Sequence, residues 1–123
     1  MYKLSVTDSF SAAHRLEGYP GACCKLHGHN WKVRVGLLAS ELDGIGLALD
    51  FGVIKAHLEE ILHELDHACL NDLPSLAGIN PSSENLAKYI FDRMEKALQD
   101  SPAQVCEVEV CESERSSVTY SHA

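Results

Sequence analysis

The alternation of apolar and polar side chains in residues 31–37, Trp-Lys-Val-Arg-Val-Gly-Leu, restricts the fold more than any other feature of this chain. A period of two is typical of a half-buried antiparallel strand, because successive side chains point to opposite faces. Residues 2–7 alternate in the same way, and the pattern can continue through Phe10 towards Ala12. The Gly- and Pro-containing segment 17–21 between these stretches is typical of a loop. We therefore expect the chain to begin with two paired strands.

The middle of the chain changes to the period of an α-helix. Asp50 is placed to cap a helix that runs to about Leu65. A second helix is expected after residues 80–81, with Ser82 or Ser83 as its cap and an end at residues 101–102. Each helix carries one apolar stripe, which predicts that both pack on the core. The stripes comprise Ile54, Leu58, Ile61, Leu62 and Leu65 in the first helix, and Leu86, Ala87, Ile90, Phe91, Met94 and Leu98 in the second.

The end of the chain returns to the strand pattern. Residues 105–112 alternate, so that one face is expected to carry Cys106, Val108, Val110 and Glu112. A turn at 113–116 and a short last strand around residues 118–120 follow. This order of elements predicts a single α+β domain over residues 1–123, with a four-stranded antiparallel sheet and two helices on one face.

Composition excludes several classes of partner. The formal net charge of −8 argues against nucleic acid and anionic membranes, since both are bound through clustered Lys and Arg. A small anionic substrate remains compatible, because a pocket can be locally positive on an acidic protein. No apolar run approaches the length of a membrane span, and the first residues lack the apolar region of a signal peptide. The 5 Cys lack the spacing of a disulfide framework, so we expect reduced thiols and a cytoplasmic protein.

Three histidines are candidate metal ligands. His27 and His29 flank Gly28, and on a strand their side chains point to the same face. His14, from the preceding strand, can supply a third imidazole. Three imidazoles hold Zn²⁺ and leave a fourth position open, as catalytic zinc sites do. Cys23 and Cys24 lie just upstream, so a thiol is expected near the metal.

A second pattern, His63-Glu64-Leu65-Asp66-His67, matches the H-E-x-x-H sequence of zinc proteases. The helical wheel places His63 opposite the apolar stripe, which favours a solvated helix face over a metal site. Asp66 beside His67 is a candidate for orienting an imidazole that transfers protons. Glu112 lies on the inward face of its strand, and a buried carboxylate needs a partner, either a ligand or an internal Arg.

Together, several short motifs resemble the 6-pyruvoyltetrahydropterin synthase family, and within it the bacterial 6-carboxytetrahydropterin synthases of the queuosine route. These motifs span nearly the whole chain: residues 10–16 (Phe-Ser-Ala-Ala-His-Arg-Leu), 23–29 (Cys-Cys-Lys-Leu-His-Gly-His), 49–51 (Leu-Asp-Phe), 65–67 (Leu-Asp-His), 70–72 (Leu-Asn-Asp), 80–87 (Asn-Pro-Ser-Ser-Glu-Asn-Leu-Ala) and the late Glu112. The resemblance implies the tunnelling fold, in which sheets of several subunits close into a barrel, and a homohexamer made of two trimers.

The resemblance also assigns roles to residues. His14, His27 and His29 would bind Zn²⁺, Cys23 would act as base, Asp66 and His67 would assist proton transfer, and Glu112 would anchor the pterin. The adjacent Cys24 leaves open which thiol is the base. The substrate implied is 7,8-dihydroneopterin triphosphate, cleaved by a carbon–carbon lyase reaction to 6-carboxy-5,6,7,8-tetrahydropterin, acetaldehyde and triphosphate. The alternatives are a 6-pyruvoyl product through triphosphate elimination, a zinc hydrolase that uses His63, Glu64 and His67, or a non-catalytic zinc-binding oligomer.

Overall fold

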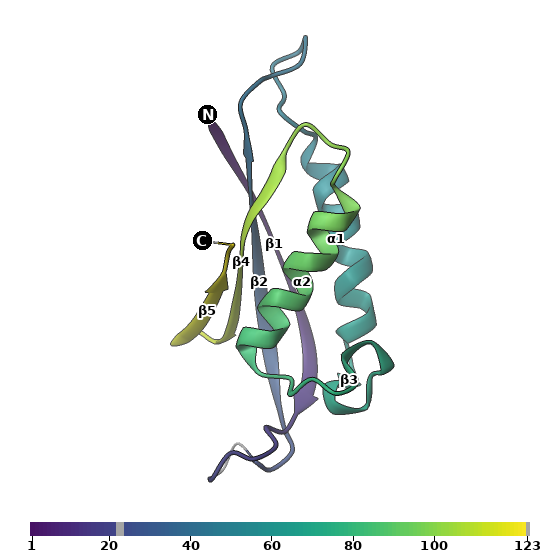
Figure 1. Cartoon of the computed structure of the whole chain (residues 1–123), viewed down its shortest axis with the longest axis vertical. Coiled ribbons are helices and arrows are strands. Elements are labelled where there is room, and N and C mark those ends of the chain that lie inside the picture. Colours follow the sequence, from purple (N-terminus) through teal and green to yellow (C-terminus); the bar gives the residue numbers. More distant parts are fainter. Residues whose placement is uncertain (22–23, 123) are drawn as a thin grey trace.

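The structure, a computed structural model, describes residues 1–21 and 24–122. A twisted sheet carries two helices on one face and leaves the other face open (Figure 1). The strands are β1 (Tyr2–His14), β2 (His27–Ala39), β3 (Ala68–Cys69), β4 (Gln104–Ser113) and β5 (Ser116–Tyr120). The helices are α1 (Phe51–Leu65) and α2 (Ser83–Ala97), and a short 3₁₀ helix, η2 (Leu70–Asp72), follows β3.

The sheet confirms the α+β class but corrects the predicted number of strands. Its order is β3-β1-β2-β4-β5, and the four longer strands are antiparallel to their neighbours, as expected. The fifth strand, β3, pairs parallel with Ala12 and Ala13 of β1, so the sheet is mixed. A strand of two residues has no alternation to read, which is why the sequence pattern does not reveal it.

The central strand β2 sets the position of the candidate ligands. It pairs with β1 on one side and β4 on the other, and the register places His27 opposite His14. Further along β2, Trp31, Val33 and Val35 are fully buried beneath the helices. The first residues of β2 thus continue directly from the core into the site.

Both predicted helices form, with Asp50 and the first of the two candidate serines as caps, although α2 ends at Ala97, before the predicted end at residues 101–102. Asp50 Oδ1 accepts a hydrogen bond from the Gly52 N–H at 2.8 Å, and Ser82 Oγ accepts one from the Asn85 N–H at 3.1 Å. All residues of the two predicted apolar stripes are buried, so each stripe faces the sheet. Among the described residues, no helix is long and apolar enough to span a membrane.

The inward face of β4 differs from the expected one at a β-bulge. The register shifts between Gly36 and Leu37, so that Val105 rather than Cys106 pairs with Leu37. The extra residue in β4 turns Val105 inward, where it is buried, and leaves Cys106 half-buried. The prediction that Cys106 shares the core face with Val108 and Val110 is therefore wrong, because strict alternation fails at a bulge.

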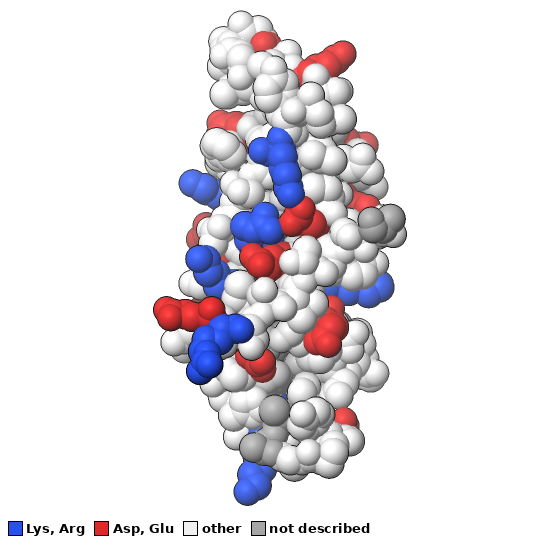
Figure 2. Space-filling view, turned by 90° about the vertical axis from the view of Figure 1, so that its left-hand side faces the viewer, with Lys and Arg blue, Asp and Glu red and all other residues white. Residues whose placement is uncertain are grey.

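The open face of the sheet carries charges of both signs in alternation, as Figure 2 shows. Arg34 Nη2 of β2 donates to Glu107 Oε2 at 2.8 Å, and its Nε donates to Glu109 Oε1 at 3.3 Å. Lys3 of β1 also contacts Glu107. The Lys3 and Arg34 hydrogen bonds lower the pKa of Glu107 below its ordinary value. This face is therefore held across three strands by ion pairs rather than by apolar packing.

Replacing Glu107 with glutamine should lower the free energy of unfolding at pH 7 by about 0.5–1 kcal/mol, the value of a partly exposed ion pair. Because the folded-state pKa is lowered, the stabilisation is complete above the ordinary Glu range near ~4.3 and is lost as the pH falls through the lowered pKa. Urea unfolding at pH 7 and at pH 3 measures the difference in unfolding free energy between parent and variant. The control is Glu60→Gln, because Glu60 is an exposed residue of α1. A difference that persists unchanged at pH 3 would contradict this origin.

Candidate metal centre

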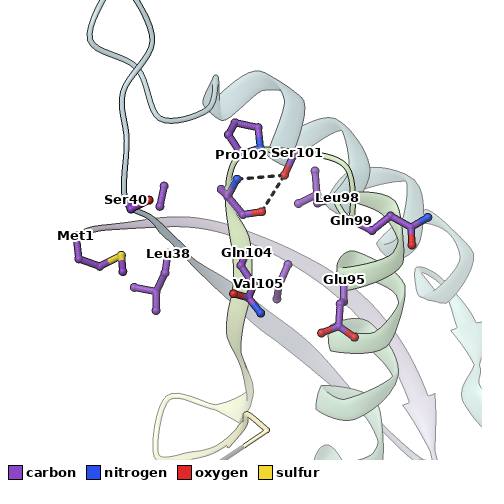
Figure 3. Close-up of a pocket in the computed structure, with 12 residues that line it drawn as sticks. Met1, Leu38, Ser40, Glu95, Leu98, Gln99, Ser101, Pro102, Gln104 and Val105 are labelled. Atoms are coloured by element: carbon purple, nitrogen blue, oxygen red, sulfur yellow. Dashed lines mark hydrogen bonds between the residues drawn. The ribbon is translucent and has the colours of Figure 1, made fainter.

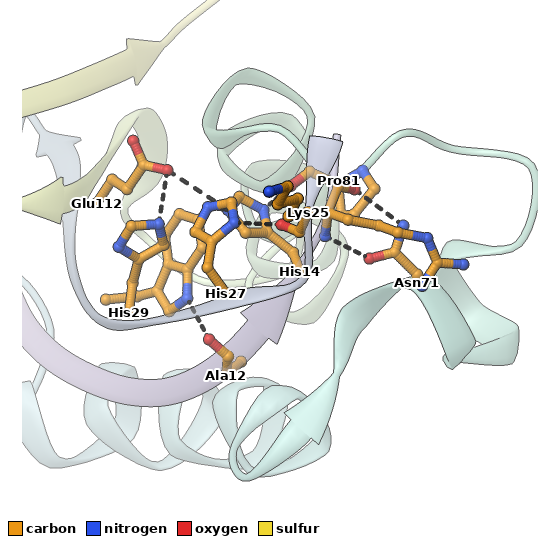
Figure 4. A network of polar contacts seen from close by, with 10 residues as sticks. Ala12, His14, Lys25, His27, His29, Asn71, Pro81 and Glu112 are labelled. Carbon is orange, nitrogen blue, oxygen red and sulfur yellow. Dashed lines mark hydrogen bonds and ion pairs between the residues drawn. The ribbon is translucent and has the colours of Figure 1, made fainter. Parts of the chain in front are cut away.

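Three imidazoles and one carboxylate converge at the end of the sheet where β1 ends and β2 begins (Figure 4). His14 comes from β1, His27 and His29 from β2, and Glu112 from β4. Each offers a ligand atom, and these four atoms lie within 4.8 Å of one another. The three predicted histidine ligands are thus brought together.

Two main-chain carbonyls fix which nitrogen of each ring carries the proton. His14 Nδ1 lies 2.7 Å from the Pro81 carbonyl oxygen, and His27 Nδ1 lies 2.6 Å from that of Lys25. A carbonyl oxygen can only accept, so both Nδ1 atoms donate and both Nε2 atoms keep a lone pair. Support of this kind is usual for metal-bound histidines, because it orients the ring and fixes its tautomer.

The free lone pairs face one another. His14 Nε2 lies 3.1 Å from His27 Nε2, and Glu112 Oε1 lies 3.4 Å from His14 Nε2 and 3.0 Å from His29 Nε2. Electron pairs and a carboxylate repel at such distances unless a proton or a cation lies among them, so this arrangement favours the binding of a cation. Donors bound tetrahedrally to zinc at ~2.0–2.1 Å lie ~3.3 Å apart, which is close to the spacing here.

His29 supplies the third observation that fits a metal. Its Nε2 is buried and makes no hydrogen bond of suitable geometry to any described residue, although Glu112 Oε1 lies 3.0 Å away. Burial is the main cause that lowers the pKa of His29 below its ordinary value. Glu112 opposes this shift, and the neighbouring His14 and His27 rings add to it. The ring is therefore held neutral, which is the form that binds metal. Trp31 forms an apolar floor, with its ring centroid 4.9 Å from that of His14 and 5.1 Å from that of His29.

Asp66 and His67 lie just beyond the C-terminus of α1, against β1. Asp66 Oδ1 accepts from the Ser11 N–H at 2.8 Å, and Asp66 Oδ2 lies 2.9 Å from His67 Nδ1. The Ser11 and His67 contacts lower the pKa of Asp66, so the carboxylate remains ionised and orients the imidazole. The His67 side chain is 83% exposed, which leaves its Nε2 accessible to a substrate. A depression along residues 11–13, 28–30 and 67–69 connects this pair with the strands that carry the histidines.

The zinc-protease pattern does not form a metal site in the described residues. Helix α1 ends at Leu65, and His67 has a left-handed backbone with φ of 57°, so His63 and His67 do not share a helix face. Glu64 is bound by Arg93, whose Nη1 lies 2.7 Å from Glu64 Oε2. Neither His63 nor His67 belongs to a described group of potential metal ligands.

The predicted base, Cys23, lies outside the residues that the structure describes. Its neighbour Cys24 is described, and its Sγ donates a hydrogen bond to the Gly21 carbonyl oxygen at 2.8 Å. This contact directs the Cys24 sulfur at the main chain of Gly21.

Two other features of the described residues could also form a site. Asp92, Glu95 and His122 also approach one another, but Asp92 already pairs with Lys88 at 2.9 Å. A hollow at the opposite end of the sheet, lined by Met1, Glu95 and Pro102 among others, contains none of the predicted site residues (Figure 3). The histidine cluster is therefore the strongest metal candidate among the described residues.

Comparison with known proteins agrees with this site and fold. The family model described as 6-pyruvoyl tetrahydropterin synthase matches residues 3–123, and the chain belongs to this family. It is 39% identical over 110 residues to a 6-carboxy-5,6,7,8-tetrahydropterin synthase from Synechocystis sp., covering 85% of this chain and 84% of that one. It is 32% identical to a 6-pyruvoyl tetrahydrobiopterin synthase from Dictyostelium discoideum, covering 95% and 93%.

A solved structure extends the likeness to the fold. The 6-pyruvoyl tetrahydropterin synthase of Caenorhabditis elegans superposes with a TM-score of 0.87 at 28% identity, covering 99% of this chain and 96% of that chain. These relatives are pterin synthases, which are enzymes of the lyase kind. The family resemblance seen in the sequence motifs is thus confirmed.

Proposed function

We propose that the protein is a zinc-dependent 6-carboxy-5,6,7,8-tetrahydropterin synthase of queuosine biosynthesis. It would convert 7,8-dihydroneopterin triphosphate to the 6-carboxy product with release of acetaldehyde and triphosphate. The observation that carries the proposal is the convergence of the His14, His27 and His29 imidazoles on one point, with Glu112 beside them. The likeness to the Synechocystis synthase supports the choice of product. The proposal includes a cytoplasmic location, which fits the finding that the described cysteines form no disulfide with one another.

Each group has a distinct task in this proposal. His14, His27 and His29 hold Zn²⁺, which supplies Lewis-acid chemistry when bound. Cys23, as thiolate, removes a carbon-bound proton from the substrate. Asp66 holds the His67 imidazole through the 2.9 Å contact, so that the exposed face of His67 can deliver or accept a proton. Glu112 accepts hydrogen bonds from two neighbouring N–H groups of the amino-pyrimidine ring.

Substituting Glu112 by glutamine should raise KM by roughly 5–150-fold while zinc stays bound to the three histidines. The carboxylate accepts at both oxygens, whereas the amide presents a donor to one substrate N–H, a mismatch that costs about 1–3 kcal/mol. Saturation kinetics and zinc content are measured on the same preparation, with Glu114→Gln in the exposed turn as control. Unchanged saturation kinetics would count against Glu112 as the anchor. Loss of zinc would instead make it a metal ligand.

The product is decided by mass analysis after incubation with 7,8-dihydroneopterin triphosphate. A 6-carboxy product with acetaldehyde is expected. The second candidate, favoured by the Dictyostelium relative, keeps all side-chain carbons and yields the 6-pyruvoyl product. If the zinc-loaded protein leaves the substrate unchanged, the result would favour a non-catalytic zinc-binding oligomer.

The proposed assembly is a homohexamer of two trimers with active sites at subunit boundaries. Among the described residues, β1 pairs with β3 only at Ala12 and Ala13, and the outer edge of β5 has no strand partner. Pairing of these edges between subunits would satisfy their main-chain groups and close a barrel. Light scattering at working concentration should give about six times the chain mass of 13.5 kDa. A monomeric mass would contradict the proposed assembly.

A further inference from the structure

Beyond the end of β1, two asparagine side chains take the place of a neighbouring strand. Asn71 Oδ1 accepts from the Arg15 N–H at 2.9 Å, and its Nδ2 donates to the Arg15 carbonyl at 3.0 Å. Asn80 repeats the arrangement at Glu17, with distances of 3.0 Å and 3.2 Å. Asn71 lies in η2, directly after β3, so the first carboxamide continues the pairing of β3 with β1.

The chemistry of these contacts requires a carboxamide. A residue in an extended chain offers one N–H donor and one C=O acceptor, and an Asn side chain offers the complementary pair. An Asp of the same shape could accept from the N–H but would place a carboxylate against the carbonyl oxygen. The two contacts lie two residues apart, at Arg15 directly after β1 and at Glu17 where a turn begins.

The same segments contact the metal centre. His14 directly precedes Arg15, and its Nδ1 donates to the carbonyl of Pro81, the residue after Asn80. Pro81 is buried and leads into the Ser82 cap of α2. The ring of His14 is therefore held by the Pro81 carbonyl. The main chain around it is held by pairing of β1 with β2 and β3 up to His14, and by the Asn71 side chain at Arg15.

We propose that Asn71 and Asn80 are positioning residues for the metal site, acting through His14. Asn71 fixes the main chain next to the ligand, and Asn80 fixes both Glu17 and the adjacent carbonyl that sets the tautomer of His14. This inference rests on the proposed metal site. Asn80 is exposed, so its removal takes little apolar surface from the core. Its effect should consequently fall on the geometry of the site more than on stability.

The test measures Zn²⁺ affinity by chelator competition for the full chain and for Asn71→Ala, Asn80→Ala and Asn80→Asp. Each variant should bind zinc roughly 10–100-fold more weakly, the effect typical of losing support around a metal ligand. Asn30→Ala is the matched control, because Asn30 is also exposed, lies next to His29, and its side chain accepts a hydrogen bond from the Ser11 hydroxyl rather than from a main-chain group beside a ligand. Its affinity should stay within about twofold of the parent.

Cobalt substitution separates positioning from general destabilisation. The visible absorption of Co²⁺ reports ligand geometry, so it should change in the Asn71 and Asn80 variants and remain unchanged in Asn30→Ala. Unfolding of the metal-free proteins is measured in parallel. Should Asn71→Ala fail to fold, the two Asn80 variants carry the test.

The outcomes distinguish the inference from the function on which it rests. Parent-like affinity and Co²⁺ spectra in both Asn80 variants would overturn the positioning role and leave the metal site intact. Absence of zinc binding by the parent chain would overturn the metal site itself, and the inference with it.

Discussion

Substitution of His27 by alanine should remove most of the bound zinc and the synthase activity together, while the chain stays folded. His27 supplies one of three imidazoles, and its Nε2 lies 3.1 Å from that of His14 at the centre of the donor group. It is the first residue of β2 and is only half-buried, so its loss removes little core packing. Loss of a ligand should weaken binding by more than the ~10–100-fold typical of supporting contacts.

Three measurements on the same sample check this result: metal analysis after dialysis for bound zinc, the turnover number for activity, and circular dichroism for folding. His63→Ala is the matched control, because His63 is exposed on α1 and belongs to no described metal-ligand group. It should keep both zinc and activity. Full zinc retention in His27→Ala would rule out the proposed site, and loss of activity in His63→Ala would revive the zinc-hydrolase interpretation.

Removal of the thiol of Cys23 should lower turnover by roughly 10²–10⁴-fold, the usual contribution of a positioned general base, while zinc stays bound. The assignment rests on the family resemblance and on the spacing of Cys23 four residues before His27. Cys24→Ala should cost far less, because the Cys24 thiol already donates to the Gly21 carbonyl.

Both cysteine variants are compared at equal zinc content, so that a loss of metal is not mistaken for a loss of the base. A severe effect at Cys24 with a mild effect at Cys23 would reverse the assignment. Equal mild effects would remove both thiols from the proton-transfer step and leave His67 as the remaining candidate.

The sequence predicts most of the scaffold because its signals are local. The caps Asp50 and Ser82 and both apolar stripes appear in the structure as expected, since a helix reveals its period over several turns. The convergence of His14, His27 and His29 also follows from strand periodicity once the two strands are paired. These ligands lie on one face of adjacent strands, which alternation can indicate.

The parts that the sequence does not predict depend on distant contacts or on the main chain. The two-residue strand β3 exists because β1 offers it an edge, and the bulge opposite Leu37 has no signal in the alternation of β4. The carbonyls of Pro81 and Lys25 orient two ligands, yet a carbonyl belongs to every residue and carries no sequence mark. Asn71 and Asn80 belong to recognised motifs, but their partners are 56 and 63 residues away.

The location of His27 and His29 on the central strand has a consequence for how long the site retains its metal. Both residues pair with β1, but the pairing of β2 with β4 begins only at Lys32, where the fully buried core residues follow. Amide hydrogens in the core of a sheet exchange with solvent mainly when the whole domain unfolds, whereas ends and edges open separately. His27 and His29 therefore lie on a part of β2 that can open while the core stays folded. Release of a bound ion would then follow the opening of this end of the β1–β2 pair more closely than global unfolding.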